Sequence, residues 1–168
     1  MGRGAVRGGF LPPAILIAAL GVALAFIPLR RALVAAGVMA LFALAFWSIG
    51  APRSLIEPIF VGCWLSVIVT AALVHRPLDL PVALFVVAAA NAGLWAGAVT
   101  AVAGKGSDLA IALPCVLLLF VGHPLVVRGW GIAVKVFASW LTAVAILATM
   151  VSLTPTPGYA PDHMEGPA

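Results

Sequence analysis

The chain has 168 residues, of which 64% are hydrophobic and only 8% are charged. Soluble domains contain roughly 45–50% apolar and 25% charged residues, so this composition excludes a water-soluble fold, which needs charge to cover its surface. The net charge of +4 comes from scattered Lys and Arg side chains. Nucleic-acid binding is excluded as well, because it requires basic residues gathered on one face.

Six stretches of the sequence lack Lys, Arg, Asp and Glu altogether. A helix needs about 20 apolar residues to cross the hydrocarbon core of a bilayer, so each stretch is a candidate span. Six spans leave almost nothing for a soluble domain. We therefore predict an all-α, polytopic integral membrane protein, a compact up-and-down bundle of about six transmembrane helices. The uncharged stretches are 8–29, 32–52, 58–75, 80–104, 109–127 and 136–161.

The first predicted helix, 12–29, follows an N-terminal tail at 1–11. Pro12 and Pro13 suit a first helical turn, where backbone donors are not needed. Arg3 and Arg7 before an apolar run resemble a secretory signal peptide. We interpret this segment as a retained first span.

The second and third helices are expected at 32–49 and 55–75. Arg30 and Arg31 precede the second helix and mark the membrane surface. The third starts just after Ser54, which forms with Glu57 an S-x-x-E pattern typical of a capping box at a helix start.

The remaining helices are expected at 80–103, 109–123 and 130–153, before a Pro- and Gly-rich tail at 154–168. Asp79 is the expected cap of the fourth helix, and Ser107 with Asp108 that of the fifth. Pro114 should bend the fifth helix and Pro124 should help to end it, because proline lacks the amide that a helix interior needs.

Small residues recur every four positions along the fourth helix, at Ala89, Gly93, Gly97 and Ala101. Helices in lipid associate by close backbone packing, for which such a face is suited. We expect this face to pack within the chain, with a seam to another subunit as the alternative.

Polar groups at mid-membrane are costly and usually functional. Asn91 is the intramembrane polar residue, expected to hydrogen-bond between helices, and Lys135 should extend back to the surface. The uncharged stretches contain no carboxylate, which argues against an ion-coupled carrier. Cys63 and Cys115 have no CxxC spacing and are expected to be small buried side chains.

A basic group is expected at one membrane surface, where its members can hold lipid phosphates. His75 and His123 should serve there for anchoring or local hydrogen bonding, although a histidine beside Asp79 would suit a lipid-headgroup enzyme. No spacing matches a catalytic signature, and we predict no catalytic residue, metal or cofactor. The expected headgroup contacts are Arg30, Arg31, His75, Arg76, His123, Arg128 and Lys135.

Three functions remain open. The first is a non-catalytic membrane subunit that packs against, stabilises or assembles a larger complex, with lipids and other membrane subunits as partners. The second is a small transporter or substrate-binding component for a small or apolar solute, and the third is the lipid-headgroup enzyme. The expected location is a bacterial inner membrane, and the paired arginines favour a cytoplasmic surface for their side. Hydroxyls suited to a solute path are Ser66, Thr70, Thr100, Ser139 and Thr142.

Overall fold

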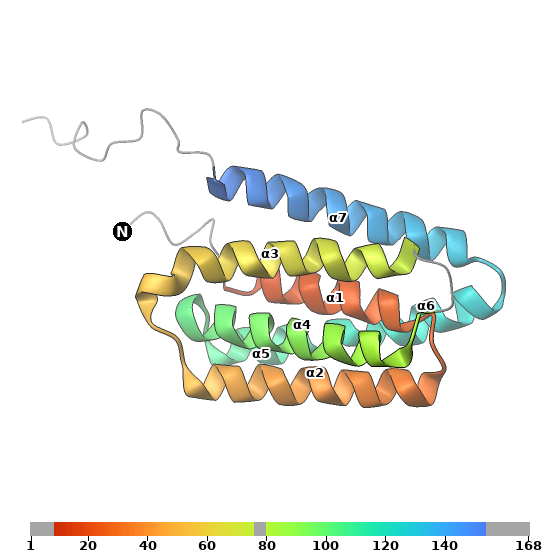
Figure 1. The fold of residues 1–168 in the computed structure, drawn as a ribbon, viewed down its shortest axis with the longest axis horizontal. Coiled ribbons are helices and arrows are strands. Elements are labelled where there is room, and N and C mark those ends of the chain that lie inside the picture. The colour runs from red at the N-terminus through yellow and green to blue at the C-terminus, as the bar shows by residue number, and fades with distance from the viewer. Residues whose placement is uncertain (1–8, 76–79, 154–168) are drawn as a thin grey trace, which may run out of the picture.

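The computed structural model describes residues 9–75 and 80–153, and every regular element in these ranges is a helix (Figure 1). Five spans are long and apolar enough to cross a membrane, so the predicted all-α, multi-pass membrane bundle is confirmed. The α-helices are α1 (Leu11–Leu24), α2 (Leu29–Ile49), α3 (Ile56–Ala72), α4 (Val82–Ala103), α5 (Gly106–Ala112), α6 (Leu118–Val127) and α7 (Gly131–Leu153). Short 3₁₀ segments at Arg53–Leu55, Leu73–His75 and Leu113–Leu117 extend α3 and join α5 to α6.

Helix α1 lies in the centre of the bundle. Its side chains are apolar on every side, and Leu16, Ile17, Leu20 and Leu24 are completely buried. It packs against α3, α4 and the α5–α6 span. A helix that is hydrophobic all round suits either a core or lipid, and the contacts of α1 place it in the core. The segment that resembles a signal peptide thus forms the central helix of the bundle.

Helix α1 is shorter than the predicted helix 12–29. It ends at Leu24, and the next amides bond to carbonyls three residues back in a tightened turn. Pro28 has no amide with which to continue the helix. With 14 residues at 1.5 Å each, α1 is about 21 Å long, shorter than a hydrocarbon core of roughly 30 Å. It is not among the five helices long enough to span a membrane.

Helices α2 and α7 form opposite outer edges of the bundle (Figure 1). Helix α2 packs chiefly against α4, and α7 chiefly against α3. Helices adjacent in sequence are therefore not always adjacent in space, since α1 and α2 share little contact. Each outer helix buries a single stripe: in α2, Ala32, Ala35, Met39 and Ala43; in α7, Val134, Ala138, Leu141, Ala145 and Thr149.

The starts of α2, α3 and α4 differ from those predicted. Helix α2 begins at Leu29, so Arg30 and Arg31 belong to its first turn and not to the connection before it. Helix α3 follows a 3₁₀ turn with Leu55 at its N-cap, which makes no side-chain cap bond, so Ser54 is not the cap. Helix α4 has Pro81 at its N-cap, and the expected cap Asp79 lies outside the described residues.

The two prolines of the fifth span have different effects. Pro114 lies in the 3₁₀ segment Leu113–Leu117, where the helix changes its winding between α5 and α6. Pro124 does not end the helix at His123, because α6 continues to Val127. Proline removes the hydrogen bond of its own nitrogen and crowds the carbonyl four residues before it. The helix nevertheless continues, and the Pro124 carbonyl accepts a bond from the Arg128 amide at 3.0 Å.

Candidate functional site

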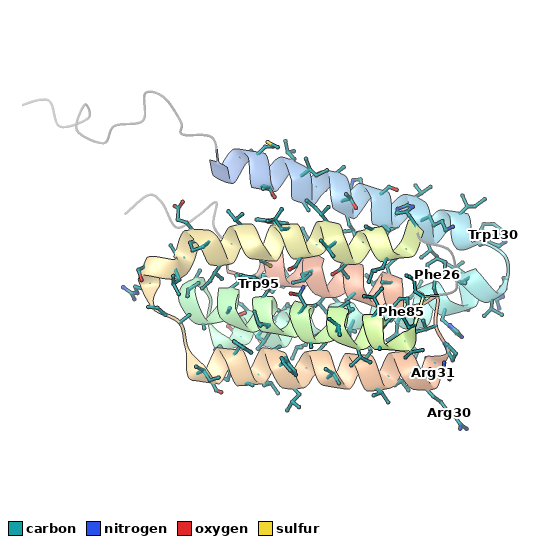
Figure 2. All side chains as sticks on the ribbon, in the orientation of Figure 1. Phe26, Arg30, Arg31, Phe85, Trp95 and Trp130 are labelled. Atoms are coloured by element: carbon teal, nitrogen blue, oxygen red, sulfur yellow. The ribbon has the colours of Figure 1, made fainter. Side chains whose placement is uncertain are left out.

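The expected basic group lies at the end of the bundle formed by the start of α2, the end of α6 and the start of α7. Figure 2 shows Arg30, Arg31 and Trp130 at this end, and all three are exposed. Arg128 follows α6 and is exposed, as is Lys135 one turn into α7. Arg76 lies outside the described residues. The described cations at the opposite end are Arg53 and Lys105, which lie close in sequence to Glu57 and Asp108.

His75 connects the end of the third span to α7. Its Nε2 atom lies 3.2 Å from Ser139 Oγ, and that hydroxyl donates to the Lys135 carbonyl at 3.1 Å. Because the only proton of the hydroxyl is already used, the Nε2–H of His75 is the donor to Ser139. His75 therefore tethers α7 through a single exposed hydrogen bond.

His123 has a different role, at the end of the central helix. Its Nδ1–H donates to the Ala25 carbonyl at 3.0 Å, one of the carbonyls left without a helical partner where α1 stops. The neighbouring Gly122 permits this approach, since a Cβ there would lie 2.8 Å from that of Ala25. The two histidines thus have separate partners on separate helices, an arrangement typical of local structural roles.

At the other end of the bundle, Asp108 stabilises the start of α5. Its Oδ2 accepts a hydrogen bond from the Lys105 amide at 2.7 Å. Helix α5 begins at Gly106, not at Leu109, so Asp108 lies inside the first turn instead of before it. An acidic side chain there also compensates the positive end of the helix dipole.

The small-residue face of α4 lies against α2. A Cβ built on Gly93 would overlap the Met39 carbonyl oxygen and lie 2.8 Å from the Phe42 Cβ. A Cβ on Gly97 would overlap the Ala43 carbonyl oxygen and lie 3.0 Å from the Phe46 Cβ. Ala89 is buried on the same face, and Ala101 is half-buried. The face therefore brings α2 and α4 into backbone contact within this chain.

A polar network lies midway along the α3–α4 pair. Asn91 Nδ2 donates to Ser66 Oγ at 3.0 Å, and Trp95 Nε1 donates to Asn91 Oδ1 at 3.0 Å. Because an indole nitrogen can only donate, the Asn91 atom beside it must be the oxygen, which fixes the orientation of the amide. The network connects neighbouring turns of α4 to α3.

A groove with a volume of about 390 Å³ opens between α3 and α4 beside this network. Trp95 forms part of its wall and crosses α3 at Gly62, where a Cβ would lie 2.6 Å from the Trp95 Cζ3 atom. In Figure 2, Trp95 lies between the two ribbons. No charged side chain of the described residues lines the groove. The lining comprises Gly62, Leu65, Ser66, Val69, Thr70, Leu73, Leu84, Val87, Ala88, Asn91 and Trp95.

The five hydroxyls expected to line a solute path lie in two different settings. Thr100, Ser139 and Thr142 donate to carbonyls four residues earlier in their own helices. Ser66 and Thr70 line the α3–α4 groove instead. Both cysteines are free, with Cys63 fully buried and Cys115 half-buried.

The groove itself was missed in the sequence, although its polar residues carried a signal. Asn91 and Trp95 are four residues apart on one helical face, the spacing at which side chains meet. The partner Ser66 is 25 positions from Asn91 on another helix, and no local pattern indicates that pairing.

Comparisons with protein-family models, with curated proteins and with solved structures found no match for this chain.

Proposed function

We propose that this protein is a non-catalytic subunit of a larger membrane complex and that it docks through the outer face of α7. The observation that supports this proposal is the exposed position of Trp140. Its side chain is 58% exposed, although it lies about 13 Å along α7 from Gly131, close to the middle of a bilayer roughly 30 Å thick. Tryptophan in membrane proteins concentrates at the two interfaces, where its N–H group reaches water or headgroups.

The position of the indole N–H of Trp140 is a second argument. Within the described ranges 9–75 and 80–153, an acceptor is found for Trp95 only, and Trp140 is the tryptophan that is both exposed and near the middle of a span. An unpaired donor in hydrocarbon is unfavourable, by about 1–3 kcal/mol judged from mutational data. A partner helix that offers a hydroxyl, amide or carbonyl oxygen at this depth would remove that cost.

The neighbours of Trp140 suit a packed interface. Phe137 stacks on its ring at a centroid distance of 5.9 Å, and both side chains are exposed. Aromatic residues dominate the binding energy of many interfaces. The partner we propose is a transmembrane helix with a small residue opposite this pair and an oxygen acceptor near it.

The filled centre of the bundle favours a subunit over a transporter. A path along the axis would need to displace α1, whose Leu16, Leu20 and Leu24 are completely buried. We further propose that the membrane is a bacterial inner membrane and that the end with Arg30, Arg31 and Arg128 is cytoplasmic. Basic residues next to spans favour the cytoplasmic side.

Co-purification from native membranes in mild detergent tests this proposal. We expect a stoichiometric membrane protein with the wild type, and a strong loss of it with Trp140→Leu. The matched control is Trp130→Leu, an exposed tryptophan directly before the start of the same helix, which should retain the partner. Interface anchors contribute about 2 kcal/mol or more, which is roughly thirtyfold in affinity. Equal recovery from both variants, or recovery of a second copy of this chain alone, would contradict the proposal.

A further inference from the structure

We propose that the α3–α4 groove binds a neutral lipid that carries a carbonyl oxygen deep in its apolar part, such as a ketone or quinone. This inference goes beyond the proposed subunit function and does not depend on it. The groove is a recess with polar groups in its lining, whereas the proposed docking surface on α7 is a convex helix face.

The first step is the unused hydrogen-bonding capacity of Asn91. A side-chain amide has two N–H donors and an oxygen with two lone pairs. The bonds to Ser66 and from Trp95 use one donor and one lone pair. Asn91 is half-buried and lines the groove, so the remaining donor is available to an occupant that offers an oxygen. Water, the usual partner elsewhere, is absent from the hydrocarbon core.

The second step is the shape of the groove. Its lining on α3 extends from Gly62 to Leu73, about 16 Å of helix. Its volume is about 390 Å³. A flexible chain or a flat ring fits, and the volume lies within the range of roughly 300–1,000 Å³ found for ligand sites.

The third step is charge and depth. Asn91 lies near the middle of α4, and the described lining contains no ionisable side chain. A charged headgroup at this depth would be costly and unpaired. The ester groups of a phospholipid stay near the interface, so only its methylene groups would reach Asn91. A neutral lipid can place its carbonyl oxygen at the midplane and accept the free Asn91 N–H.

Photolabelling of the purified protein in phosphatidylcholine vesicles tests this site. The probe is a long-chain ketone with its carbonyl at mid-chain and a diazirine near one end. One control probe is the alkane of equal length with the same diazirine, and another is a phosphatidylcholine carrying that diazirine in an acyl chain. Mass spectrometry then maps labelled residues, with Leu65, Val69 and Val87 as the expected positions in the groove.

We expect the ketone to label these positions at a lower membrane concentration than either control probe. Asn91→Leu should raise its half-maximal concentration roughly fivefold, the effect of one net hydrogen bond of about 1 kcal/mol. Thr142→Val, which removes a hydroxyl from α7 outside the groove, should leave it unchanged. Ala88→Leu fills the groove without touching the network and should abolish labelling, which guards against misfolding of the Asn91 variant. Labelling equal for ketone and alkane, or strongest for the phospholipid, would overturn the proposal.

Discussion

Replacing Gly93 with alanine measures how tightly α2 is held against α4. The added Cβ would lie 2.8 Å from the Phe42 Cβ and 3.0 Å from the Ala43 nitrogen, and would overlap the Met39 carbonyl oxygen. Carbon atoms in contact prefer about 3.5–4.0 Å, so α2 must retreat by roughly 1 Å. The obstructing atoms include backbone and a Cβ, which no change of rotamer can move. Overpacking of this kind costs about 1–3 kcal/mol.

Gly37 provides the matched control, because it lies in α2 and a Cβ there would meet nothing within 4 Å. Alanine in place of glycine favours a helix by about 0.8–1.0 kcal/mol at either position, so the difference between the variants isolates the clash. We expect Gly93→Ala to be less stable than Gly37→Ala by about 1–3 kcal/mol.

The assay is unfolding of each variant in mixed dodecylmaltoside–SDS micelles, followed by circular dichroism and tryptophan fluorescence. Gly37→Ala should unfold at the same or a higher SDS fraction than the wild type, and Gly93→Ala at a lower one. If both variants unfolded together, the close approach of α2 and α4 at Gly93 would be refuted.

Three further outcomes are expected. His123→Leu should lower the free energy of unfolding by about 0.5–1.5 kcal/mol in the same assay, and His75→Leu by less, because its hydrogen bond is exposed; the reverse order would contradict the assigned roles. Asn91→Leu should destabilise by about 0.6 kcal/mol and at most about 1.7, the range for hydrogen bonds between membrane helices, and a gain in stability would count against the network. Reporter fusions after Arg31 and after Arg53 should lie on opposite sides of the membrane, and matching reports would contradict a spanning α2.

The spans were predictable because they depend on composition alone. Charged residues cannot remain in hydrocarbon, so stretches such as 32–52 and 80–104 indicate α2 and α4 without knowledge of their neighbours. Boundaries were less accurate where a tertiary contact decides them. Helix α1 stops at Leu24, where His123, 98 positions away from Ala25, takes up a free carbonyl.

The arrangement of the helices was not predictable from their hydropathy. All spans are apolar, so the hydropathy pattern of α1 does not indicate that this helix lies at the centre of the bundle. The small residues of α4 indicated a close contact but not its partner, because α2 meets them through the carbonyl oxygens of Met39 and Ala43. Because every residue has the same backbone atoms, the sequence does not indicate which residues make such backbone contacts.

Crosslinking at position 140 in living cells tests the proposed docking face most directly. A photoreactive benzoylphenylalanine would replace Trp140 and, in a separate variant, Leu41, an exposed residue on α2 at the opposite edge of the bundle. The account predicts a discrete adduct with another membrane protein from position 140 and only lipid adducts from position 41. Lipid adducts alone from position 140, or the same protein adduct from both positions, would contradict it.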